Sequence, residues 1–330
     1  MIPASTQHAP DRRIAAGHVA LSAVQVGFGL FPVFGMIAFQ PGGFSPLGVG
    51  TWRIAVGAAV LAFVAALRYG RAMLPARRDI AVLFACAMLG VAVNQGLFLV
   101  GLSRSTPMNA GLVMSLIPVF TFTIAAAVGQ ERFSGMRALG VVVALGGTAP
   151  LLLTDGLNGL GAYGLGNLLM VANGLSYSFY LVLSKPLTRR YPALVITAWS
   201  YVFAIVALPV FAIGQRFTPD PGMGSAWWSL LYILAIPTVL AYLLNMFALA
   251  RVRASTVAVY VYSQPIISGL ASWVVFGERP TMAMGLATPA IFVGIWLVSR
   301  RPPPANAGID GFATRRPTTS APLDPTDTTA

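Results

Sequence analysis

Residues 254–298 read ASTVAVYVYSQPIISGLASWVVFGERPTMAMGLATPAIFVGIWLV, and only Glu278 and Arg279 carry a charge in this stretch. The two charges divide it into two long apolar runs. A helix rises about 1.5 Å per residue and the hydrocarbon core of a bilayer is about 30 Å thick, so about 20 apolar residues cross it. Each run is therefore long enough for one membrane-spanning helix.

Eight more apolar runs precede this pair. The ten predicted spans cover 18–40, 46–69, 80–101, 107–129, 136–154, 163–185, 192–214, 228–249, 254–276 and 282–299. The first run has no Ala-x-Ala cleavage site and is long enough to cross, so we expect a retained helix and not a signal peptide. The predicted fold class is an all-α integral membrane protein with ten transmembrane helices.

The composition favours the same class. Apolar residues make up 57% of the 330 residues and charged residues only 9%, whereas charged residues are about a quarter of an ordinary soluble protein. The single cysteine, Cys86, excludes an internal disulfide and a cysteine-based metal cluster. We expect no metal and no cofactor.

The net charge of +12 indicates topology. Of the 21 lysines and arginines, 17 flank the predicted spans on one side, and Arg104, Arg216 and Arg279 lie on the other. Cytoplasmic loops are enriched in Lys and Arg, so we expect a multi-pass protein of the plasma (inner) membrane with both termini in the cytoplasm. The positive charge is thus not interpreted as a nucleic-acid surface.

The chain also contains an internal repeat. Its only two glutamates, Glu131 and Glu278, are each followed by arginine and stand 147 positions apart. The same offset relates three further pairs: Pro118 and Pro265, Gly147 and Gly294, and Trp52 and Trp199. Each unit holds five spans, and an odd number means that the second copy enters the membrane inverted. Two inverted five-helix repeats are typical of alternating-access transporters whose substrate site lies near the midplane.

These boundaries divide the chain into four parts. Residues 1–17 form a cytoplasmic N-terminal segment, 18–154 the first repeat, and 155–301 the second, inverted repeat. Residues 302–330 are rich in Pro, Thr and Ala, and such a composition predicts a disordered cytoplasmic tail.

The repeat motifs resemble a known family. In both copies a proline precedes the glutamate by 13 residues, as in MSLIPVFTFTIAAAVGQERFSGMRALGVVVALGG at 114–147, where Gln130 separates the glycine from the glutamate. TWRIAVGAAVLAF at 51–63 is similar to the second helix of the same family. Over about 18–300 the chain resembles EamA-type members of the drug/metabolite transporter superfamily. The resemblance implies a ten-helix bundle, with both ends inside, that moves small metabolites, often outward.

Polar side chains within the spans indicate where a substrate binds. Amides in hydrocarbon need partners, and they either join helices or line a wet cavity. The candidate cavity residues are Gln25, Asn94, Gln95, Asn173, Tyr177, Tyr242, Asn245, Tyr262, Gln264 and Arg53. Arg53 is the one charge within a span. It either holds an anionic substrate group, or snorkels to the outer interface or bonds a neighbouring carbonyl.

Three prolines are candidate hinges. Pro118, Pro265 and Pro237 each remove a backbone donor and free a carbonyl inside a span. Neighbouring Ser or Thr hydroxyls are the alternative partners for those carbonyls. Because Pro118 and Pro265 occupy equivalent places in the two repeats, the pattern favours hinges beside the binding site.

No enzyme is expected. The only histidines, His8 and His18, lie in the N-terminal segment and at a membrane edge, and no Asp or Glu lies in the middle of a span. We expect a secondary transporter, an exporter or exchanger, of small polar metabolites such as amino acids, working by alternating access around a central midplane cavity. Its partners are a small-molecule substrate and the lipid bilayer, and a homodimer is compatible with the sequence. The alternative is a lipid-scrambling or structural membrane protein.

Overall fold

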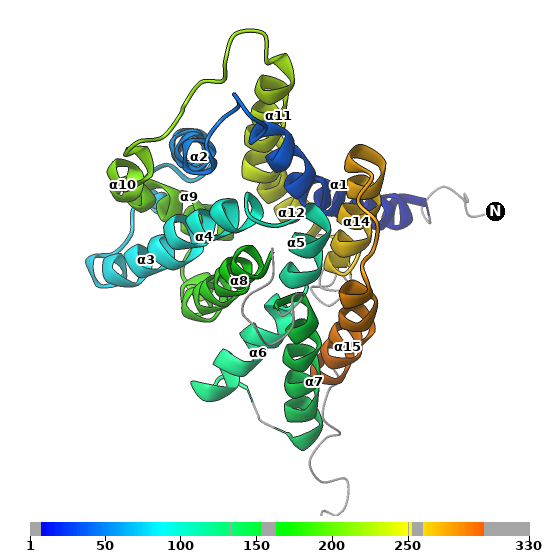
Figure 1. The fold of residues 1–330 in the computed structure, drawn as a ribbon. Helices are drawn as coiled ribbons and strands as arrows, with labels where there is room; N and C mark the ends of the chain where they lie inside the picture. The colour runs from blue at the N-terminus through cyan, green and yellow to red at the C-terminus, as the bar shows by residue number, and fades with distance from the viewer. Residues whose placement is uncertain (1–7, 132–133, 153–162, 250, 253–259, 300–330) are drawn as a thin grey trace, which may run out of the picture. The chain divides into compact units, whose positions relative to one another are not determined.

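The computed structural model of the chain describes residues 8–131, 134–152, 163–249, 251–252 and 260–299. Every regular element in these ranges is a helix, and no strand occurs among them (Figure 1). The predicted all-α class is confirmed for this part of the chain. The predicted tail, 302–330, lies outside the described residues, as do residues 155–162 at the start of the predicted second repeat.

The helices follow the predicted spans in order. The first half of the chain contains α1 (His8–Ala38), α2 (Pro46–Tyr69), α3 (Ile80–Ala87), α4 (Val93–Leu102), α5 (Pro107–Met114), α6 (Ile117–Ala127) and α7 (Gly135–Leu152). The second half contains α8 (Gly164–Ser184), α9 (Ala193–Ala204), α10 (Leu208–Ala212), α11 (Gly224–Ala235), α12 (Ala241–Leu249), α14 (Gln264–Phe276) and α15 (Met282–Ser299).

Within the described residues, seven helical segments are long and apolar enough to cross a membrane. They are Ile14–Ala38, Pro46–Met73, Arg77–Leu102, Pro107–Ala127, Gly164–Ser184, Ala193–Ala212 and Gly224–Ala248. The apolar helices Gln264–Phe276 and Met282–Val298 are shorter. The chain is therefore a multi-pass membrane protein.

Two spans are interrupted at positions 147 residues apart. A turn at Ser115 and Leu116 separates α5 from α6, and a turn at Tyr262 and Ser263 precedes α14. Pro118 and Pro265 then stand in the first turn of α6 and α14. A proline is tolerated there because the first N–H groups of a helix have no partner within the helix. Each of these prolines thus begins a new helix and does not kink a continuous one.

Two other interruptions are π-helical. The segment η3 (Met88–Ala92) lies between α3 and α4, and η7 (Ile236–Leu240) lies between α11 and α12. Shifted by 147 positions, the range of η3 falls one residue before that of η7. Single π-helical turns inside α-helices occur frequently at functional sites.

Helices α7 and α15 pack side by side along glycines (Figure 1). A Cβ atom on Gly147 would lie 2.6 Å from the Cβ of Ala290, and one on Gly294 would lie 2.5 Å from the Cβ of Ala144. Small residues at such a contact let two helix backbones approach closely, which is how membrane helices associate without a hydrophobic driving force. The glycines of the run at 140–147 thus allow α7 and α15 to pack closely.

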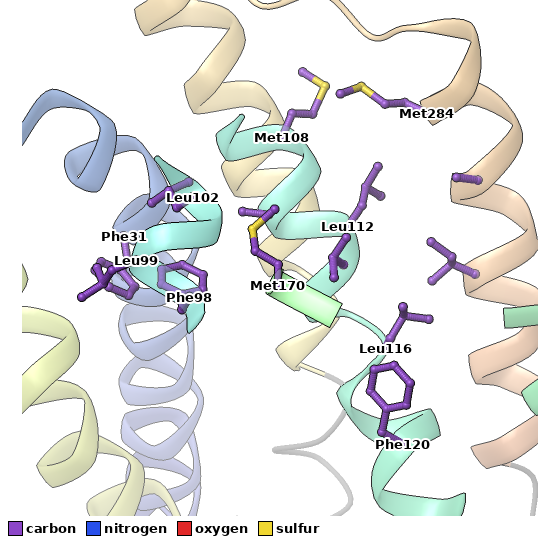
Figure 2. Packing of buried hydrophobic residues seen from close by; sticks show 14 of the residues in the cluster. Phe31, Phe98, Leu99, Leu102, Met108, Leu112, Leu116, Phe120, Met170 and Met284 are labelled. Atoms are coloured by element: carbon purple, nitrogen blue, oxygen red, sulfur yellow. The ribbon is translucent and has the colours of Figure 1, made fainter. Parts of the chain in front are cut away.

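A hydrophobic cluster joins α15 to the middle of the fold. Figure 2 shows Met108 of α5 and Met284 of α15 turned toward each other, and Leu112, Leu116 and Phe120 following one another along α5 and α6. Leu116 is fully buried. The cluster continues to Phe31 and Phe98, whose rings stack with centroids 4.9 Å apart.

We predict that Gly147→Val destabilises the protein, because the added methyl groups collide with Ala290 and with the backbone N of Ile291. Overpacking of this kind costs about 1–3 kcal/mol. The matched control is Gly146→Val, since a Cβ atom at Gly146 meets nothing within 4 Å. The thermal unfolding midpoint of the purified protein in detergent checks this. Equal midpoints for the two variants would contradict the packing described.

Candidate functional site

One large cavity of about 710 Å³ lies among the helices of both halves of the chain. This volume is within the range of small-molecule sites, which is about 300–1,000 Å³. All ten candidate cavity residues lie on its wall: Gln25, Arg53, Asn94, Gln95, Asn173, Tyr177, Tyr242, Asn245, Tyr262 and Gln264. The structure thus brings them together, while their role in binding stays a prediction.

Several wall amides are held by each other. The side chain of Gln264 donates to Oε1 of Gln25 at 2.6 Å and joins α14 to α1. Asn94 and Asn173 donate reciprocally, each side chain to the backbone oxygen of the other, at 3.3 and 2.6 Å. These contacts tie α4 to α8, so Asn94 and Asn173 also join helices.

Two wall amides keep an oxygen without a protein partner. Gln95 is buried and donates from Nε2 to the Tyr201 hydroxyl at 3.2 Å, yet its Oε1 has no hydrogen-bond partner among the described residues. Oδ1 of Asn245 is likewise buried and unpartnered in that part of the chain. A buried acceptor without a donor costs about 1–3 kcal/mol. Both oxygens belong to cavity residues and can accept a hydrogen bond from a bound solute.

Arg53 is the buried cation of the wall. Its side chain is only 5% exposed, which rules out snorkelling to the interface. Nε donates to the Thr238 hydroxyl at 3.0 Å, and the guanidinium carbon lies 4.4 Å from the centroid of the Phe31 ring. Arginine over an aromatic face is a favourable arrangement because the ring face is negative.

The π-helical segment η7 prepares the position of Thr238. Pro237 lacks the N–H that would normally bond Ile233 O, and the Thr238 hydroxyl donates to that carbonyl at 2.7 Å instead. The same hydroxyl oxygen then accepts from Arg53. Pro237 does not line the cavity. It shapes the segment whose Thr238 holds Arg53.

Tyrosines and phenylalanines form the aromatic part of the wall. Tyr201 and Tyr242 meet edge to face with ring centroids 6.3 Å apart, and Tyr177 lies beside Tyr180. Tyr201 is buried, and a Cβ atom on Gly57 would lie 2.4 Å from its ring. The absence of a side chain at Gly57 thus lets α2 press against Tyr201.

The cavity reaches one end of the helices. Its wall includes Gln130 and Glu131 after α6, Arg137 of α7 and Lys185 at the end of α8. Glu131 and Arg137 form an ion pair at 3.1 Å. These residues belong to the span ends that carry 17 of the 21 lysines and arginines. We call this region the charged mouth.

The opposite ends of the helices are joined by polar contacts. Ser105 donates to Asn167 at 2.5 Å and links the end of α4 to α8. Ser268, a wall residue near the start of α14, donates to the backbone oxygen of Pro107 at 2.6 Å and links α14 to the first residue of α5. None of the residues 103–110 belongs to the cavity wall. The charged mouth is thus the end of the described helices that the cavity reaches.

None of the four acids whose side chains the structure describes pairs with Arg53. Asp79 pairs with Arg190 and also accepts from the Tyr191 hydroxyl, Asp220 pairs with Arg216, and Glu278 accepts from Ser272. Glu131 is engaged at the charged mouth. The expectation that no carboxylate lies in the middle of a span holds for these four residues, and Asp155 lies outside the described ranges.

The sequence predicted the amides but missed other parts of the site. Tyr201 was missed because a tyrosine in an apolar run is most simply a core residue, and Thr238 because its role depends on the π-helical turn around it. Pro237 was the available signal for that turn. Of the hinge candidates, Pro118 lines the cavity, whereas Pro265 and Pro237 do not.

Known proteins resemble this chain over most of its length. A Bacillus subtilis (strain 168) protein named "Uncharacterized transporter YyaM" is 24% identical over 269 residues, which are 78% of this chain and 87% of that protein. A "Probable terminal-alkyne amino-acid exporter" from Streptantibioticus cattleyicolor is 24% identical over 263 residues, or 78% and 86% of the two chains. A solved crystal structure shares the fold with a TM-score of 0.60 and 19% identity, covering 86% of this chain and 96% of its own.

The family model that matches is the EamA-like transporter family, over residues 15–153 and 164–300. The two matched regions coincide with the two halves whose side chains form the cavity. The chain belongs to the EamA-like transporter family.

Proposed function

We propose that this protein is a secondary transporter, an exporter or exchanger of small polar metabolites, with amino acids as the first candidates. The observation that carries the proposal is the cavity, whose wall combines amides, tyrosines and one buried arginine from both halves of the chain. A relative named as an amino-acid exporter supports the choice of first candidates. The protein acts on its cargo by moving it, without catalysis.

The proposed architecture is ten transmembrane helices in two inverted five-helix repeats. Two tryptophans 147 positions apart support it. Nε1 of Trp52 donates to the backbone oxygen of Phe217 at 3.0 Å, and Nε1 of Trp199 donates to that of Met73 at 2.7 Å. Each half thus fastens a loop of the other half through the equivalent side chain. The interruptions before α6 and α14, and the pair η3 and η7, support the same relation.

Alternating access requires that the cavity open to one side at a time. In the structure described, the cavity reaches the charged mouth, while polar contacts join the other ends of the helices. We infer an inward-facing state, with the charged mouth and both termini in the cytoplasm of a cell whose plasma membrane holds the protein. Among the described residues, Glu131 is the one acid of the cavity wall. Exchange and facilitated diffusion both fit such a wall.

A transport assay tests this proposal. Liposomes that contain the purified protein are loaded with a panel of labelled amino acids, and flux is measured with and without an imposed pH gradient. We expect saturable flux of at least one solute, and Gln264→Ala and Asn94→Ala each to raise its apparent KM or lower its rate several-fold. Gln215→Ala is the control, because Gln215 lies outside the cavity wall and its side chain donates to Ile213 in its own loop. Lipid flip without saturable flux of any solute would contradict a carrier and favour a scramblase.

A pair of cysteine variants tests the inversion. Arg71 and Thr218 are both exposed and stand 147 positions apart, so they are equivalent in the proposed repeats. In a Cys86→Ala background, we expect Thr218→Cys to react with a membrane-impermeant maleimide in intact cells. Arg71→Cys should react only after the cells are opened. Reaction of both from the same side would contradict the inverted arrangement.

A further inference from the structure

Arg53 is a buried cation that lacks a counter-ion in the part of the chain the structure describes. It is 5% exposed, and the four acids whose side chains the structure describes, Asp79, Glu131, Asp220 and Glu278, each have another partner. An ionised side chain at membrane depth is costly unless it is paired or functional. A cation without an acid partner on the wall of a cavity favours an anionic group in the bound solute.

The guanidinium is held in place through only one of its nitrogens. Nε donates to Thr238, which is itself fixed to Ile233, and Phe31 covers one face of the group. Phe31 in turn stacks on Phe98 (Figure 2). The two terminal nitrogens have no protein partner among the described residues. Arginine binds a carboxylate best with two parallel N–H donors, and here its position is fixed before a ligand arrives.

A second set of unpartnered groups belongs to the same wall. Oε1 of Gln95 and Oδ1 of Asn245 are buried acceptors without donors in the described ranges. Tyr201 lies between Gln95 and the helix of Arg53, because its hydroxyl accepts from Gln95 and its ring lies against Gly57, one helical turn after Arg53. Asn245 follows Tyr242 by three residues on α12, and the Tyr242 ring meets that of Tyr201. The wall thus offers the two terminal nitrogens of Arg53 as donors to an anion. It also offers Oε1 of Gln95 and Oδ1 of Asn245 as acceptors for a donor group.

We propose that Arg53 binds the carboxylate of the transported solute, and that Gln95 and Asn245 accept hydrogen bonds from its ammonium group. The cargo is then a small amino-acid-like zwitterion. The proposal rests on the function proposed above and deepens it. The tyrosines contact the apolar or cationic part of the solute, since aromatic faces attract ammonium groups.

The test uses the unaltered protein first. Leucine, phenylalanine and threonine are each compared with their amide, which lacks the carboxylate, and with their deaminated acid, which lacks the ammonium. Binding is measured by ligand-induced thermal shift of the purified protein and by competition against flux in liposomes. We expect at least one of the amino acids to bind, its amide to bind roughly 10- to 100-fold more weakly, because hydrogen bonds to charged groups are that strong, and its deaminated acid to bind more weakly than the parent.

Variants then assign the preference to Arg53. Arg53→Gln should remove most of the difference between acid and amide, and Arg53→Lys should restore part of it by restoring the charge. Arg68→Gln is the matched control, since Arg68 lies on the same helix but is exposed. It should leave the preference unchanged. Should Arg53→Gln fail to fold, the ligand series on the unaltered protein still tests whether binding requires the carboxylate and the ammonium group of the solute.

The outcomes separate the two proposals. Amides that bind as tightly as their parents would overturn the role of Arg53 even where flux shows a transporter. Binding that depends on Arg53 without flux would overturn the transport function and keep the anion site. Deaminated acids that bind as tightly as the amino acids would overturn the role of Gln95 and Asn245. No binding by the three amino acids or by their deaminated acids would overturn the whole inference.

Discussion

In the hydrocarbon core of a bilayer, no water is available to satisfy a backbone N–H or C=O group. Helices are the consequence, and any departure from a regular helix must lie where protein groups or a wet cavity take over the lost bonds. The described departures occur at Ser115–Leu116, at Tyr262–Ser263 and in the π-helical segments η3 and η7. Each lies beside the cavity, because its neighbours, such as Met114, Asn94, Gln264 and Tyr242, are wall residues.

At these interruptions nearby hydroxyls bond to backbone carbonyls, and at Pro237 the hydroxyl takes up the carbonyl that the proline frees, which links local sequence to the shape of the site. Ser115 donates to Leu112 at 2.6 Å, Ser263 to Tyr260 at 2.7 Å and Thr238 to Ile233 at 2.7 Å. At Pro237 the contacts show the second explanation considered for the prolines, a hydroxyl partner for the freed carbonyl, while the hinge role stays a prediction. The hydroxyl of Thr238 repairs the helix, and the same hydroxyl positions Arg53. Repair of the backbone and construction of the site use one residue.

Most of the fold could be predicted from the sequence, because a membrane-spanning helix is indicated by a local run of apolar residues. Apolar runs set the span positions within a few residues. The site was less accessible to such reasoning. Amides are rare in spans, so Gln25, Asn94 and Gln264 were conspicuous. Their partners are not local, and no sequence pattern pairs Asn94 with Asn173 or identifies Tyr201 as the partner of Gln95.

The difference between partnered and unpartnered wall groups bears on how a transporter releases its cargo. Most wall amides already bond to one another, so their capacity for a solute is small, while Arg53, Gln95 and Asn245 hold unused groups. If the cargo carboxylate pairs with Arg53, binding relieves the cost of a lone buried cation, and that cost returns when the cargo leaves. Affinity is then limited by one ion pair and a few hydrogen bonds. Such a site distinguishes solutes by charge, yet it binds weakly enough for release on the other side of the membrane.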